Sequence, residues 1–211
     1  MQSFEIAIFL QFFLGLVAAV NPVGIMPVFV SLTGHMTEEK NKTAATANIA
    51  VAIILIIALL AGQMLLDLFS ISLDSFRVAG GLLLLSIAFS MMSGKLGEDK
   101  QNKQEKSEYI SREQIAVVPL AMPLMAGPGA ISSTIVYGSR YPNMLDTLGI
   151  ILTVVAFSFC SWLLFRSAPY IVRLLGQTGI NVITRIMGLI LGALGIEFIA
   201  NGLRNLFPGL A

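Results

Sequence analysis

The sequence predicts an all-α membrane protein with six transmembrane helices, arranged as two inverted three-helix repeats in which the first and fourth helices are broken. Apolar residues make up 56% of the 211 positions and charged residues only 12%, about half the share usual in soluble proteins. Six apolar segments reach the ~20 residues that a helix needs to cross the hydrocarbon core. Short motifs also recur between the two halves of the chain at nearly constant spacing.

The apolar runs place the six expected spans. Backbone polar groups inside a bilayer must be satisfied within each span, so every run is expected to be helical. The expected spans are 4–32, 45–66, 75–92, 114–138, 145–165 and 182–203. The first run lacks the basic leader and the small-residue cleavage site of a secretory signal, so we expect it to be retained as a span.

Basic residues flank these spans unevenly. The connections after the first, third and fifth spans hold ten of the 13 Lys and Arg residues, and the other side holds three. Because cytoplasmic loops are enriched in Lys and Arg, both termini are expected on the outer side of the membrane. The polar segment 94–113 is then a cytoplasmic linker between a first repeat, 1–93, and a second repeat, 114–211.

Composition excludes several classes of function. A formal net charge of +1, without a long basic tract, argues against nucleic-acid partners. The single cysteine, Cys160, lies in an apolar run and allows neither an intrachain disulfide nor a cysteine metal site. The one histidine, His35, is weak evidence for chemistry. No metal or cofactor is therefore expected. The absence of a His pair, paired acids or a nucleophile elbow at plausible depth argues against an enzyme.

Two sets of markers indicate an internal repeat. An Arg and two Gly residues recur at a constant offset of 108, as Arg77, Gly80 and Gly94 and as Arg185, Gly188 and Gly202. The first span carries Asn21-Pro22-Val23-Gly24 and the fourth carries Gly127-Pro128-Gly129, at a nearly equal offset of 106. Three spans per half is an odd number, so the second half must enter from the opposite face. Such short matches also arise by chance in a Gly- and Leu-rich chain.

The first and fourth spans carry helix-breaking residues at equivalent positions. Proline removes amide donors and blocks the preceding turn, while glycine permits non-helical torsions. Paired interruptions in corresponding spans are typical of a transporter binding site. The expected substrate-binding residues are Asn21, Pro22, Gly24, Gly127, Pro128, Gly129, Ser132 and Ser133. The alternative is that these kinks only shape helix packing.

Charged residues at depth are the other candidates. Glu197 lies inside the sixth span, with Asn201 and Arg204 on the same helix face. It is either a protonatable coupling residue or a member of an ion pair with Arg204. Arg77 and Arg185 open equivalent spans, where each either anchors in lipid headgroups or braces the broken helix of its own half.

Three segments carry a resemblance to a known family. They are Asn21-Pro22-Val23-Gly24-Ile25-Met26-Pro27-Val28-Phe29, Ser93-Gly94-Lys95-Leu96-Gly97-Glu98-Asp99-Lys100 and Pro123-Leu124-Met125-Ala126-Gly127-Pro128-Gly129-Ala130-Ile131. The whole chain resembles the bacterial MarC-related integral membrane family, and most of all its YchE-type members. The resemblance implies a six-span inner-membrane protein of the neutral amino acid transporter family that includes SnatA, which is associated with proton-linked movement of glycine and alanine.

These observations lead to one expected function and one alternative. The expected function is secondary transport of small neutral amino acids, coupled to protons or another ion, by alternating access around a midplane site in the bacterial inner membrane. The alternative is a non-transporting inner-membrane assembly or stress-response protein, which leaves the doubled proline breaks unexplained. The bilayer is the remaining partner, and the sequence leaves open the exact substrate, the direction of transport and the oligomeric state.

Overall fold

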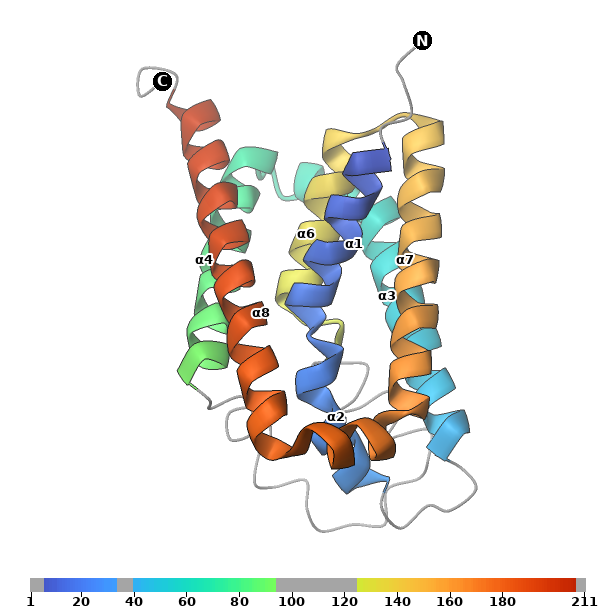
Figure 1. The fold of residues 1–211 in the computed structure, drawn as a ribbon. Helices are drawn as coiled ribbons and strands as arrows, with labels where there is room; N and C mark the ends of the chain where they lie inside the picture. The colour runs from blue at the N-terminus through green and yellow to red at the C-terminus, as the bar shows by residue number, and fades with distance from the viewer. Residues whose placement is uncertain (1–5, 34–39, 94–124, 208–211) are drawn as a thin grey trace.

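The computed structural model describes residues 6–33, 40–93 and 125–207 (Figure 1). Every regular element within these residues is an α-helix, which confirms the predicted all-α class. The linker 94–113, the first part of the predicted fourth span and His35 lie outside the described residues.

Within the described residues, five stretches are long and apolar enough to cross a membrane. They match the predicted first, second, third, fifth and sixth spans: α1 (Ile6–Val20) continued by α2 (Pro22–Leu32), then α3 (Lys40–Leu68), α4 (Leu73–Ser93), α7 (Met144–Arg166) and α8 (Ala168–Leu206). The described part of the fourth span is α6 (Pro128–Arg140). At about 1.5 Å per residue its 13 residues extend only about 20 Å.

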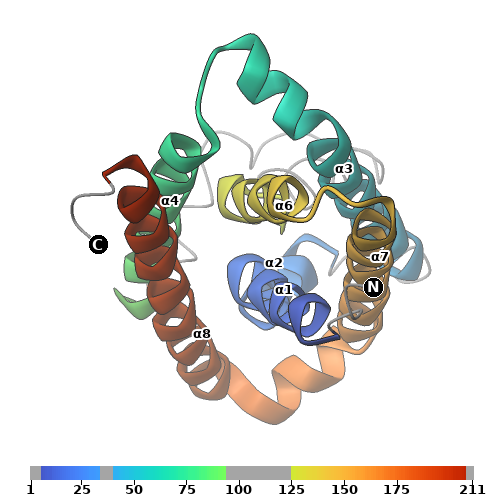
Figure 2. The same cartoon turned by 90° about the horizontal axis from the view of Figure 1, so that it is seen from above.

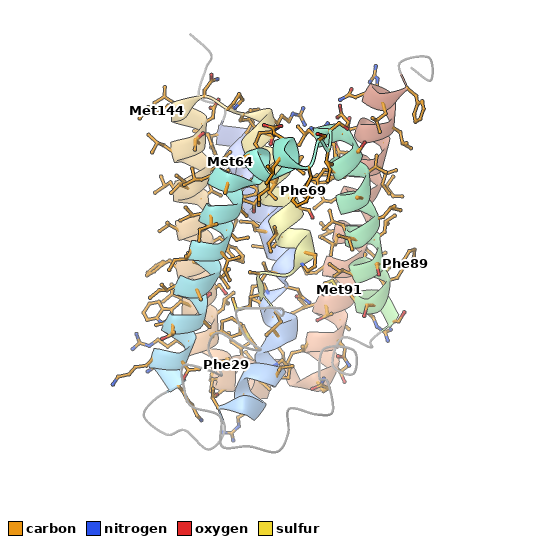
Figure 3. The ribbon with its side chains drawn as sticks, turned by 180° about the vertical axis from the view of Figure 1, so that it is seen from behind. Phe29, Met64, Phe69, Phe89, Met91 and Met144 are labelled. Carbon is orange, nitrogen blue, oxygen red and sulfur yellow. The ribbon has the colours of Figure 1, made fainter. Side chains whose placement is uncertain are left out.

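The helices form a wall around a centre. Seen from above, α3, α4, α7 and α8 surround α1, α2 and α6 (Figure 2). We call the end at which α1 begins and α8 ends the terminal end (Figure 1). Large apolar side chains point outward from this wall, among them Met64, Phe69, Phe89 and Met144 (Figure 3). Such a surface suits lipid rather than water.

The interior is built from two apolar clusters. The larger cluster joins α1, α2, α3, α6 and α7, with fully buried side chains such as Phe12, Leu55 and Phe165. The smaller cluster joins α4 and α8 with the end of α1, through Leu84, Leu191 and Ala18. The central helices α1, α2 and α6 are therefore held mainly by apolar packing.

Helices α4 and α8 pack closely and antiparallel. A Cβ atom added to Gly81 would lie 2.6 Å from the carbonyl oxygen of Gly195, and one added to Gly202 would lie 2.8 Å from the carbonyl oxygen of Asp74. Nearer the other end of the pair, Gly188 faces Ala88. Only residues without side chains allow backbones to approach this closely. The glycines of α8, Gly188, Gly195 and Gly202, thus form a packing surface against α4.

The sixth span differs from its predicted bounds. The sequence predicts a start at residue 182, whereas α8 begins at Ala168 and bends at Gly176, where φ is 60° and ψ is 177°. This backbone conformation is essentially restricted to glycine. Residues 168–175 therefore run across the end of the bundle opposite the terminal end, from α7 to the upright part of α8 (Figures 1 and 2).

Candidate functional site

The first span is interrupted at Asn21, as the sequence predicts. Asn21 adopts the left-handed conformation, with φ 47° and ψ 65°, and Pro22 opens α2. Asparagine tolerates this region better than most residues, and proline suits a first helical position because it has no amide to satisfy. The Asn21 Oδ1 atom accepts a hydrogen bond of 3.3 Å from the Gly24 amide, so the side chain caps α2.

Asn21 also links this break to α8. Its Nδ2 donates to the Thr184 Oγ1 atom at 3.4 Å, and both residues are buried. A Cβ atom on Gly24 would clash with the Asn21 amide and would lie 2.7 Å from Thr184 Oγ1. Thr184 is thus in tight contact with Asn21 and with Gly24, which lies 160 positions earlier in the sequence.

The start of α6 is the second half of the candidate site. Gly127 is extended, with φ −72° and ψ 170°, and Pro128 opens the helix. Gly127 has no side chain that could cap this end. The first amides of a helix have no partner within it, and those of Gly129 and Ala130 form no hydrogen bond with another described residue.

Three hydroxyls follow on α6, and all three side chains are buried. Ser132 donates to the Pro128 carbonyl oxygen at 2.6 Å, and Thr134 donates to the Ala130 carbonyl oxygen at 2.8 Å. Ser133 forms no hydrogen bond within the described part of the chain. Ser133 is therefore the hydroxyl of this cluster that is free to bind something else.

The two helix starts have equivalent surroundings. Pro22 and Pro128 both occupy the first turn of a helix that begins inside the protein. Helix α2, from the first half of the chain, packs against α8 from the second. Helix α6, from the second half, packs against α4 from the first, where Gly80 lies next to Ser132 and Gly129 next to Leu84.

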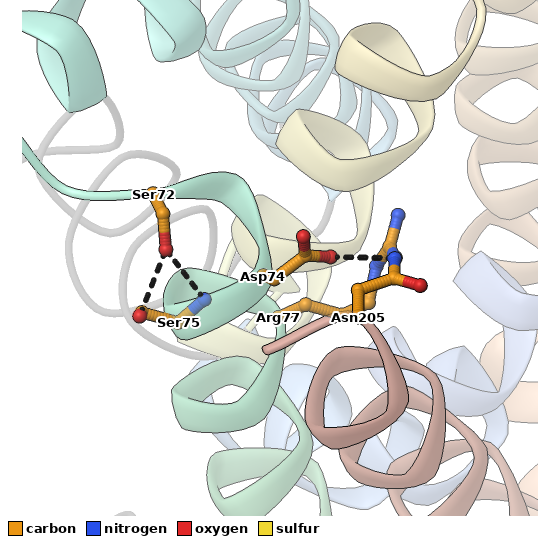
Figure 4. Close-up of polar contacts among 5 residues, drawn as sticks. All are labelled: Ser72, Asp74, Ser75, Arg77 and Asn205. Atoms are coloured by element: carbon orange, nitrogen blue, oxygen red, sulfur yellow. Dashed lines mark hydrogen bonds and ion pairs between the residues drawn. The ribbon is translucent and has the colours of Figure 1, made fainter. Parts of the chain in front are cut away.

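Arg77 is buried, with 8% of its surface exposed, and it pairs with Asp74 on the same helix at 3.1 Å. Asn205 of α8 donates to the same Asp74 oxygen at 3.0 Å (Figure 4). Arg77 therefore belongs to a polar link between α4 and α8 at the terminal end. Neither Asp74 nor Asn205 was predicted as a partner of Arg77, although an Asp three residues earlier on the same helix is a signal for an intrahelical pair.

The other charged candidates are not gathered at the break. Arg185 is exposed, and it is its neighbour Thr184 that reaches α2. Glu197 and Asn201 are exposed on α8, and Glu197 forms no ion pair with Arg204 or any other described residue.

Thr184 is the site residue that sequence reasoning missed. A threonine beside an arginine near the start of a span carries no local signal of a partner. Its role follows only from the packing of α2 against α8.

Comparisons with known proteins cover nearly the whole chain. The family model described as MarC family integral membrane protein matches residues 6–207. The chain is 62% identical to the UPF0056 membrane protein YhcE of Escherichia coli, over 98% of this chain and 97% of that protein. It is 37% identical to a UPF0056 membrane protein of Pyrococcus horikoshii, over 94% of this chain and 96% of that protein. No solved structure matches the chain.

Proposed function

The chain belongs to the MarC family of integral membrane proteins, and from this premise we propose that it is a secondary transporter of small neutral amino acids, coupled to protons or another ion. One observation carries the proposal: two helices, α2 and α6, begin inside the helical bundle at Asn21-Pro22 and at Gly127-Pro128. Irregular backbone at such a position is tolerated where protein or a water-filled path satisfies it, which is a common design of transporter sites.

The two helix starts suggest how an amino acid would bind. The positive end of a helix dipole and its open amides favour a carboxylate. At α2 the capping position is already taken by the Asn21 side chain, whereas at α6 the capping position is held by Gly127, which has no side chain. We assign the substrate carboxylate to the start of α6, with the Ser133 hydroxyl as a further donor. Asn21, Pro22 and Gly24 would form the opposite wall.

Alternating access follows from an inverted repeat. The exchange of partners, α2 with α8 and α6 with α4, is the arrangement expected when a two-fold axis in the membrane plane relates the halves. The antiparallel pair α4 and α8 would lie on that axis, because each is the last helix of its half. Rocking of the halves would then open the site to one side and close it to the other.

Glu197 is the proposed coupling residue. An acid inside an apolar span costs on the order of 2.5–3.5 kcal/mol on insertion scales, so its position needs a reason. It is exposed on α8 and has no ion-pair partner within the described residues. A carboxylate in this position can take up and release a proton as the halves rock. Arg77, held by Asp74, would support the α4–α8 pair rather than bind substrate.

The proposal includes a location. Since Lys and Arg gather in the connections between spans one and two, three and four, and five and six, both termini would lie on the periplasmic side of a bacterial inner membrane.

Uptake by proteoliposomes tests the proposal. Radiolabelled glycine, alanine and serine should accumulate when a proton gradient is imposed, and Glu197→Gln should abolish accumulation but keep exchange. A protein that only supports membrane assembly would give no flux for any of these solutes. Accumulation by Glu197→Gln equal to that of the unmodified protein would remove Glu197 from the coupling mechanism.

A further inference from the structure

The corner between α7 and α8 carries positive charge without any acid. Between Asp146 and Glu197 the sequence contains no Asp or Glu, and its charged residues are Arg166, Arg173 and Arg185. All three side chains are exposed, and none forms an ion pair with any residue that the structure describes. Two of them, Arg166 and Arg173, lie at the corner itself and have no acidic partner among the described residues.

The length of α8 places the start of the helix at the membrane surface. Its 39 residues would extend about 58 Å as a straight helix, roughly twice the ~30 Å hydrocarbon core. The bend at Gly176 removes this mismatch by turning residues 168–175 across the end of the bundle (Figure 2). This segment therefore lies along the membrane interface instead of spanning it.

The segment is amphipathic in the way that interfacial helices are. Ala168 is buried, and Ile171 and Val172 pack against the larger apolar cluster. Tyr170 and Leu174, one helical turn apart, are each 70% exposed. An exposed Tyr and Leu beside Arg is typical of a helix that dips its apolar side chains below the headgroups.

Arg166 is positioned at the same level. Its guanidinium lies 5.7 Å from the centre of the Trp162 ring, within range of a cation–π interaction. Trp and Arg at the end of a span are the usual anchors at the headgroup layer.

We propose that this corner, made of Arg166, Tyr170, Arg173 and Leu174, is a binding surface for anionic phospholipid. The arginines would donate to phosphate oxygens of the headgroups, a geometry that guanidinium matches well. Tyr170 and Leu174 would contact the upper acyl carbons, which a free phosphate ion does not offer. The partner is therefore a lipid rather than a soluble anion, and the proposal is independent of whether the protein transports amino acids.

Native mass spectrometry of the full-length protein tests this surface. With phosphatidylglycerol and phosphatidylcholine offered together, the protein should retain phosphatidylglycerol. The double variant Arg166→Gln, Arg173→Gln should lower that preference on the order of thirtyfold. The matched control, Arg140→Gln with Arg204→Gln, removes two exposed arginines at the terminal end and should keep the preference.

Further measurements test the proposal even if the double variant does not fold. Retention by the unmodified protein should fall between about 0.05 M and about 0.5 M NaCl, because exposed charge pairs are screened. Salt-independent retention, or full competition by inorganic phosphate, would overturn the proposal. A double variant that keeps its preference would also overturn it, as would a dimer of the chain that covers the corner and excludes lipid.

Discussion

Asn21 shapes the break in the first span through both its backbone and its side chain. Its left-handed conformation turns α1 into α2, and its side chain caps α2 and reaches Thr184. A residue that must supply both properties has few replacements. Glycine can adopt the backbone conformation but cannot make the side-chain contacts. Alanine cannot make the contacts either, and it adopts the backbone conformation only with strain.

We therefore expect Asn21→Ala to be less stable than Asn21→Gly. The alanine variant loses the cap and keeps a side chain in a region that costs about 1–2 kcal/mol per residue. The glycine variant loses only the contacts. Thermal unfolding in detergent should show a loss of about 1–3 kcal/mol for the alanine variant and less for the glycine variant. Equal stabilities would mean that the left-handed conformation is not what Asn21 supplies.

Replacing Ser133 tests whether the hydroxyls of α6 bind substrate or only support packing. Ser133 is a buried residue whose hydroxyl has no hydrogen-bond partner among the described residues, whereas the next hydroxyl, Thr134, is bonded to Ala130. Ser133→Ala should raise the half-saturating substrate concentration for uptake about tenfold or more, because a hydrogen bond to a charged group contributes about 1.5–3 kcal/mol. Thr134→Val, the control on the same helix, should leave that concentration unchanged. A reversed order would move the site away from Ser133.

Helices α4 and α8 are the element pair that joins the two halves of the chain. Their glycines bring the backbones into direct contact, and the Asp74–Arg77–Asn205 link closes the terminal end of the pair (Figure 4). Close packing of this kind lets two helices move as one body or slide past each other without separating.

The glycine contact can be tested by adding one methyl group. Gly81→Ala places a Cβ 2.6 Å from a backbone oxygen, which cannot move unless the helices separate. We expect a loss of about 1–3 kcal/mol in the free energy of unfolding. Gly192→Ala is the matched control, since its Cβ would meet Ala88 at an ordinary 3.5 Å. If both variants are equally stable, the α4–α8 contact is looser than described.

At the scale of the whole molecule, the positions of the spans were predictable and the contacts between them were not. The length of the apolar runs predicted the five spans found among the described residues, because each span must satisfy the hydrogen bonds of its own backbone. The break at Asn21 was predictable from proline and glycine chemistry. Thr184 was not predicted, because its partner lies 163 residues away in the sequence. Residues 168–175 were missed because their length was too short to resemble a span.

The orientation of the whole molecule has its own test. A periplasm-active reporter fused after Ala211 should be active, and the same reporter inserted after Gln104 in the linker should be inactive. The physical reason is the excess of Lys and Arg on the linker side of the bundle. The opposite pattern of activity would reverse the orientation.

Counterflow is the measurement that tests whether the interrupted helices form a carrier site. Proteoliposomes preloaded with unlabelled alanine and diluted into labelled alanine should transiently concentrate the label inside, because a carrier exchanges one solute for another at a site that faces one side at a time. Glycine or serine as the preloaded solute should support the same overshoot. Equilibration without an overshoot would indicate a channel. The absence of flux for all three solutes in a folded protein would contradict a carrier site at the interrupted helices.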